Sequence, residues 1–141
     1  MTRPVAIRPP SASGTSVIVP VAERPTPLDR LYEEFSPPVR ARGPSEFVFV
    51  VEAWRRDVTR PLRELIDAGE PIRIVEIEHS ASEATLIEAG AAQSSHPVLL
   101  VLPPYPRVTS EGVGRLLDVL REERLDLVTA ARHPRRDPLW N

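Results

Sequence analysis

The sequence has no cysteine, no long apolar run and no excess of positive charge. Without cysteine the chain has no disulfide, no thiolate metal ligand and no cysteine nucleophile, which suits a cytoplasmic location. No apolar stretch approaches the roughly 20 residues that a membrane-spanning helix needs. The net charge is −2 and the sequence pI is about 5.9, so a general nucleic-acid-binding protein is not expected.

Proline, in contrast, is abundant, with 17 among the 141 residues. No P-x-x-P tract dominates, so stiffened turns and a disordered tail are favoured over a proline-recognition ligand. We expect a disordered Pro-rich tail at residues 1–14, which lacks the continuous apolar region of a secretory signal. Residues 132–141 form a basic tail, for which solvation is a simpler explanation than binding to phosphate or an anionic membrane. One α/β domain is expected between them, at residues 15–131.

Several short apolar runs predict strands. Phe47–Val51 and Val98–Leu102 are continuous and therefore typical of buried strands in a parallel sheet, whereas Ile72–Glu78 alternates and predicts a strand nearer the sheet edge. Ser16–Val21 is rich in β-branched residues and predicts a further strand. Leu127 with Val128 predicts a last short strand.

Helical patterns separate these runs. Thr26 is predicted as the N-cap of a first helix, which carries an apolar stripe and ends at Ser36-Pro37-Pro38. The stripe consists of Leu28, Leu31, Tyr32 and Phe35. Three further helices are predicted at Thr59–Ala68 with Gly69 as the stop, from Ser82 to about Gln93, and from Ser110-Glu111 onward.

Strands that alternate with helices over short connections predict an α/β fold with a doubly wound, mostly parallel, Rossmann-like sheet. In such sheets ligands bind beyond the carboxyl ends of the strands. Pro103-Pro104-Tyr105 directly follows the run Val98–Leu102, so these three residues are expected at the ligand-binding edge.

The order and spacing of several segments resemble family-two glycosyltransferases with the GT-A fold. The resemblance covers about Thr15 to the C-terminus and is greatest for the branch that transfers sugars to polyprenyl or dolichyl phosphate. It implies the nucleotide-sugar-binding half of a GT-A fold. The matching segments are Ser16–Val21, Glu46–Val50, Arg73–Val75, Ala89-Gly90, Val98–Leu102, Asp126–Val128 and Arg135–Trp140.

The resemblance also implies where a nucleotide-sugar site lies, and there the residues differ from the family pattern. A Tyr-Asn-Glu type turn becomes Ala22-Glu23-Arg24, and the paired aspartates fall on Val51-Glu52. Glu83 stands where a lysine or arginine is common, and Pro103-Pro104-Tyr105 replaces the metal-binding Asp-x-Asp. The implied, vestigial site consists of Pro20, Val21, Glu23, Glu52, Trp54, Glu83, Pro103 and Tyr105.

These differences remove most of the chemistry that the family uses. Carboxylates normally hold Mg²⁺ or Mn²⁺ against the leaving diphosphate, and only Glu52 keeps an acidic group in register. We therefore expect no metal site, no cofactor and no catalytic residue. The family's acceptor half, which carries the catalytic base, normally begins about where this chain reaches Asn141.

The leading hypothesis is a glycosyltransferase-like domain that is non-catalytic and kept for binding or assembly, as a homodimer or with a protein partner, with a nucleotide-sugar as the candidate ligand. The alternative is an active transferase, either metal-independent or completed by a partner chain. The third hypothesis is a doubly wound interaction module whose resemblance to glycosyltransferases is coincidental. Trp54 and Tyr105 are expected near the carboxyl edge, where they stack on a ligand or, as we favour, plug a vacated pocket. The histidines His79, His96 and His133 lack metal-ligand spacing and are expected on the surface or in loops.

Overall fold

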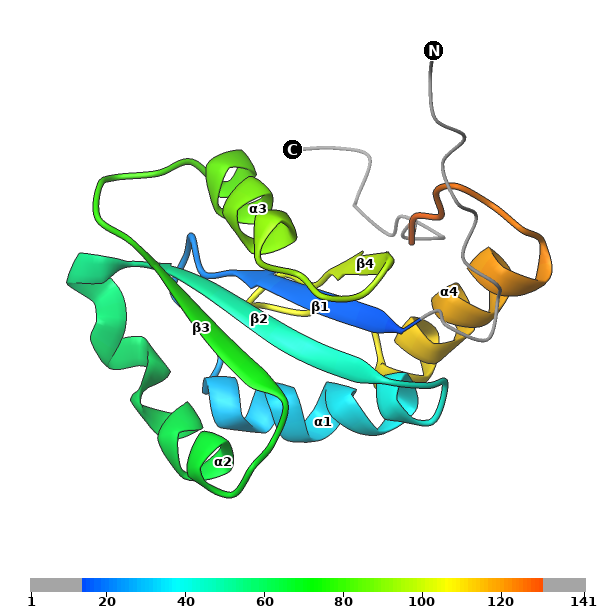
Figure 1. Cartoon of the computed structure of the whole chain (residues 1–141), viewed down its shortest axis with the longest axis horizontal. Helices are drawn as coiled ribbons and strands as arrows, with labels where there is room; N and C mark the ends of the chain where they lie inside the picture. Colours follow the sequence, from blue (N-terminus) through cyan, green and yellow to red (C-terminus); the bar gives the residue numbers. More distant parts are fainter. Residues whose placement is uncertain (1–13, 131–141) are drawn as a thin grey trace, which may run out of the picture.

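The computed structural model describes residues 14–130. The two predicted tails, apart from Gly14, lie outside these residues. Within them, four parallel strands form one sheet in the order β3-β2-β1-β4 (Figure 1). The strands are β1 (Thr15–Pro20), β2 (Ser45–Glu52), β3 (Ile72–Ile77) and β4 (Val98–Val101). The predicted Rossmann-like α/β fold is confirmed.

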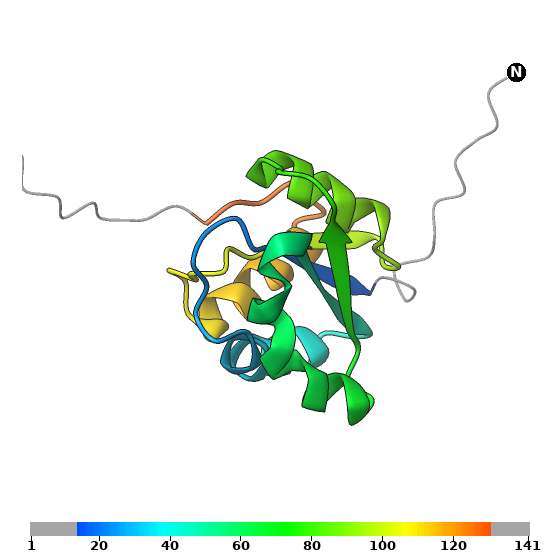
Figure 2. The ribbon, with the colours of Figure 1, turned by 90° about the vertical axis from the view of Figure 1, so that its left-hand side faces the viewer.

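Helices cover the two faces of the sheet unequally. Figure 2 shows α3 (Glu83–Ala92) on one side and the other helices on the opposite side. Those other helices are α1 (Leu28–Arg40), the 3₁₀ helix η2 (Ala53–Leu62), α2 (Arg63–Asp67) and α4 (Ser110–Glu122). Since strand side chains alternate between faces, Val17 and Phe47 pack in the larger cluster with α1 and α4, whereas Ile18 and Val48 pack beneath α3.

Helix α1 does not end at Ser36-Pro37-Pro38 as predicted; it continues to Arg40. Proline lacks the N–H donor but has a helical φ, and the carbonyl of Pro37 still accepts from the N–H of Ala41. Val39, one turn beyond Phe35, is buried in the larger cluster, and this burial favours the extra turn. The helix also has no side-chain N-cap, so the prediction for Thr26 is wrong.

The other helix predictions are mostly confirmed. Ser82 caps α3 by accepting from the N–H of Thr85, and Gly69 follows α2 with a φ of +88°. The predicted helix at Thr59–Ala68 is 3₁₀ up to Leu62 and α-helical from Arg63 to Asp67. The 3₁₀ segment begins earlier, at Ala53, and its backbone is kinked at Arg55. In α4 the cap is Thr109, one residue before the predicted Ser110, and its hydroxyl accepts from the N–H of Gly112.

Strands β3 and β4 are the two borders of the sheet, as predicted for β3 but not for β4. The continuous run Val98–Leu102 predicted a buried strand, yet Leu99 and Val101 are 46% and 43% exposed. These side chains are exposed because α3 packs over β1, β2 and β3 and does not cover the same face of β4. Leu127 and Val128 form no strand, and Leu127 is 77% exposed.

Candidate functional site

The chain reverses direction across the sheet between β1 and β4. β2 and β3 are added on one side of β1, and the connection through α3 then returns to the other side, where β4 lies. Such a switch point opens a crevice at the carboxyl ends of the two strands, which is where ligands bind in open parallel sheets. The crevice is bordered by the segments that follow Pro20 and Leu102.

A groove of about 1860 Å³ extends from this crevice along β4. Five of the eight predicted site residues line it, so the structure brings them together: Pro20, Glu23, Glu83, Pro103 and Tyr105. Glu52 and Trp54 do not line the groove, and Val21 is buried in the larger core cluster. The groove is also lined by segments that sequence reasoning did not assign to the site, namely β4 itself, one face of α4 and residues 125–130.

Pro103-Pro104-Tyr105 lies at the carboxyl end of β4, as predicted. Pro104 is buried, and its carbonyl oxygen accepts from the hydroxyl of Thr26 at 2.6 Å and from the N–H of Thr26 at 3.2 Å. The segment after β4 is therefore fastened to the segment before α1. Pro103 and Tyr105 are exposed on either side of this contact.

The carboxylate of Glu52 is engaged in internal contacts. Its Oε2 accepts from the indole Nε1–H of Trp54 at 3.0 Å and from the N–H of Ala81 at 3.3 Å. The hydrogen bond from Trp54, together with those from Ala81 and Ser80, lowers the pKa of this carboxyl below its ordinary value. Glu52 thus joins the end of β2 to the segment before α3 and is buried there.

Trp54 and Tyr105 lie at the carboxyl edge but plug no pocket, because Trp54 is 74% and Tyr105 46% exposed. The side chain that bridges the strand ends is Arg55. Its guanidinium donates to the carbonyls of Val21 at 3.3 Å and Glu23 at 2.7 Å, and it also lies 5.5 Å from the ring centroid of Trp54. Sequence reasoning missed Arg55; the available signal was a cation three positions after the last residue of a buried strand.

The residues at this edge do not fit a Mg²⁺ or Mn²⁺ ion. Between residues 14 and 130, no three histidine or carboxylate side chains are grouped so that they could hold a metal. His79 is exposed and contacts the neighbouring carbonyl of Ser80, and the N–H of His96 donates to Ser16. Both agree with the prediction of surface or loop histidines, whereas His133 lies outside the described residues.

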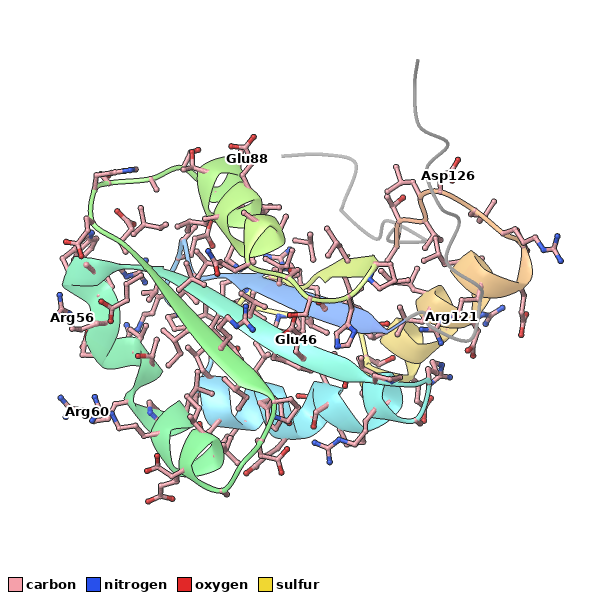
Figure 3. All side chains as sticks on the ribbon, viewed as in Figure 1. Glu46, Arg56, Arg60, Glu88, Arg121 and Asp126 are labelled. Atoms are coloured by element: carbon pink, nitrogen blue, oxygen red, sulfur yellow. The ribbon has the colours of Figure 1, made fainter. Side chains whose placement is uncertain are left out.

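A second polar cluster lies at the opposite, amino end of the sheet and was not predicted. Glu46 of β2, which is labelled in Figure 3, is buried. Its Oε1 accepts from the hydroxyl of Ser16 at 2.8 Å and the N–H of Ser95 at 2.6 Å. Burial alone would raise the pKa of Glu46, but these hydrogen bonds and the charges of Arg73 and His96 lower it below its ordinary value. The cluster ties β1, β2 and the segment before β4 together.

Neither protein-family models nor curated protein sequences gave a match to this chain. Between residues 14 and 130, no helix is both long and apolar enough to cross a membrane.

Proposed function

We propose that this chain is a glycosyltransferase-like α/β domain that transfers no sugar and serves assembly, in the cytoplasm, with another polypeptide. The order and spacing of the segments that resemble family-two glycosyltransferases support the first part. The strand order β3-β2-β1-β4 agrees with it, because it equals the first four strands of doubly wound nucleotide-binding sheets.

The observation that carries the proposal is the internal use of the oxygen atoms at the donor-site positions. In the segment that replaces the Asp-x-Asp motif, the buried carbonyl of Pro104 accepts two hydrogen bonds from Thr26. At the one position that keeps an acidic group, the carboxylate of Glu52 accepts from Trp54 and Ala81. Hard cations need several oxygen ligands, and these oxygens are already engaged.

The charges of the groove also disfavour a nucleotide diphosphate. Its charged lining residues are three carboxylates, Glu23, Glu83 and Asp126, and one guanidinium, Arg107. A diphosphate brought into this groove meets more like charge than opposite charge, which weakens binding. An enzyme that stabilises a departing diphosphate needs the reverse arrangement.

The groove is instead suited to another polypeptide. It combines exposed apolar side chains with the open border of a sheet, and both features favour association between proteins. This is the basis for assembly as the proposed role.

Titration calorimetry with UDP-, GDP- and dTDP-sugars, each with and without Mn²⁺, tests the non-catalytic part. We expect no binding in the micromolar range. Micromolar, Mn²⁺-dependent binding that Glu52→Gln abolishes would contradict the proposal and support an active transferase, and micromolar binding without metal would support the metal-independent alternative. Glu88→Gln is the matched control, because Glu88 is exposed and projects from α3 away from the sheet (Figure 3). Circular dichroism establishes that both variants are folded.

A further inference from the structure

Exposed apolar side chains gather along the open border of β4. Six large hydrophobic residues between 14 and 130 are conspicuously exposed, and five of them line the one groove, whereas the sixth, Trp54, lies outside it. The five are Leu99, Val101, Tyr105, Leu125 and Leu127. Monomeric proteins seldom leave such side chains together in one place, so this grouping marks an interaction surface.

The backbone of β4 is open at the same place. β4 is the last strand of the sheet, at the border opposite β3 (Figure 1), and only β1 pairs with it among the described strands. The N–H groups of Val98 and Leu102 donate to β1. Because backbone groups alternate in direction along a strand, those of Leu99 and Val101 point away from β1 toward the open border.

β4 has only four residues and is flanked by prolines, but its border lacks the charges and the internal proline that commonly prevent strands from pairing. From Pro97 to Pro106 there is no charged residue, and β4 itself contains no proline. Natural edge strands commonly carry lysine, an inward-pointing charge, a bulge or an internal proline. Pro97, Leu99, Val101 and Pro103 alternate along the chain, so all four face the open border. Because proline has no N–H to donate, only Leu99 and Val101 can pair fully with another strand.

We propose that a second copy of this chain pairs with β4, so that two sheets join into one across a twofold axis. This inference rests on the proposed role in assembly and names its partner. A twofold axis perpendicular to the sheet makes the two β4 strands antiparallel and keeps like faces together. Self-association fits a border without charge, because a border that carried charge of one sign would repel its own copy.

The two prolines select one register. With Leu100 of one copy opposite Leu100 of the other, Leu99 faces Val101 and the two pairs exchange four N–H···O=C bonds. The same register places Pro97 opposite Pro103, so the positions without an N–H lie opposite each other, just outside the paired residues. A shift by two residues in either direction places a proline opposite Leu99 or Val101 and loses bonds. In the selected register the exposed Leu99 and Val101 side chains also cover each other as cross-strand pairs.

Sedimentation velocity of the full chain over a range of concentrations tests the association. We expect a dimer for the wild type and at least about tenfold weaker association for Val101→Pro, which removes one outward N–H and one apolar side chain. Glu88→Gln is the control, because Glu88 is exposed on α3 and does not line the groove, and it should dimerise like the wild type. A wild-type monomer at about 100 μM would overturn the proposal and leave the groove to another occupant, as would a dimer that Val101→Pro does not weaken.

Cysteine substitutions test the register, since the natural chain contains no cysteine that could give background cross-links. Residues that face each other in a non-hydrogen-bonded antiparallel pair lie about 4.5 Å apart at Cα, within disulfide range. Leu100→Cys should therefore form a disulfide-linked dimer on oxidation, and Leu99→Cys and Val101→Cys should form little. Cross-linking strongest at residue 99 or 101 would overturn the register. Failure of these tests leaves the sugar-binding result unchanged, so the two proposals are tested separately.

Discussion

The hydroxyl of Thr26 donates to the carbonyl oxygen of Pro104 at 2.6 Å, although the two residues are 78 positions apart in the chain. Thr26 precedes α1 and Pro104 follows β4, so this hydrogen bond joins the two segments that border the switch point between β1 and β4. Thr26, which was predicted to cap a helix, therefore holds together the two segments that border the candidate site.

Replacing Thr26 by valine keeps the shape of the side chain and removes the donor. The buried carbonyl of Pro104 then retains only the backbone N–H of Thr26, and we expect the free energy of unfolding to fall by about 0.5–1.5 kcal/mol. Urea denaturation followed by circular dichroism measures the loss. Thr26→Ser retains a hydroxyl and should lose less; a serine variant less stable than the valine variant would contradict the role given to this bond.

The Glu46 cluster predicts a loss of stability in acid. Because the pKa of Glu46 is lower in the folded protein than its ordinary value of 4.5, its stabilising effect is complete above that value and disappears as the pH falls through the folded pKa. Glu46→Gln should remove about 1–3 kcal/mol at pH 7, where the charged acceptor for Ser16 and Ser95 is lost. Urea midpoints between pH 3 and 7 should then vary less for the variant than for Glu88→Gln. Parallel pH profiles for the two variants would show that Glu46 contributes nothing to the acid transition.

The phenol of Tyr32 predicts a corresponding loss of stability in alkaline solution. Burial raises the pKa of Tyr32 from 10.0 to about 12, and the hydrogen bond from its hydroxyl to Glu70 Oε2, at 2.6 Å, adds to the shift. A raised pKa means that the stabilisation is complete below pH 10 and is lost as the pH rises toward 12. The chain has two tyrosines, so in Tyr105→Phe the absorbance of phenolate reports Tyr32 alone. We expect a midpoint near pH 12; a midpoint near 10 would show that Tyr32 is not held as described.

Periodicity predicted those parts of the fold that depend on local pattern. The runs at Val17 and Phe47 are apolar at every position because each strand is covered on both faces, and this is visible in the sequence. The exposure of Leu99 was not predictable, because its cause is the absence of a covering helix over β4. Helix α1 continues through Pro37 because Val39 is buried, and that burial depends on tertiary contacts.

The candidate site shows the same division. The position of Pro104 at the carboxyl end of a strand could be predicted, because Pro104 follows the apolar run Val98–Leu102 in the sequence. Its partner Thr26 could not, because a contact between segments 78 residues apart is decided by strand order. Arg55 was missed for a related reason: its acceptors are backbone carbonyls, which have no signature in sequence.

Gly90 provides a test of the packing between α3 and the sheet. A Cβ at this position would lie 2.6 Å from Cγ2 of Ile18 and 2.9 Å from Cγ2 of Val50, closer than such atoms approach, so the helix or the strands must shift. Alanine normally favours a helix over glycine by about 1 kcal/mol, yet we expect Gly90→Ala to destabilise the protein by about 1–3 kcal/mol through overpacking.

The double variant Val50→Ala with Gly90→Ala distinguishes overpacking from other causes. Because Val50→Ala removes one of the two methyl groups that the new Cβ meets, the double variant should lose less stability than the two single variants lose together. Gly69→Ala is the comparison, since a Cβ there meets nothing within 4 Å and any loss comes from its φ of +88°. Urea denaturation of the wild type, the two single variants and the double variant gives the coupling energy between positions 50 and 90. Strict additivity between these positions would mean that α3 does not approach the sheet as closely as Gly90 implies.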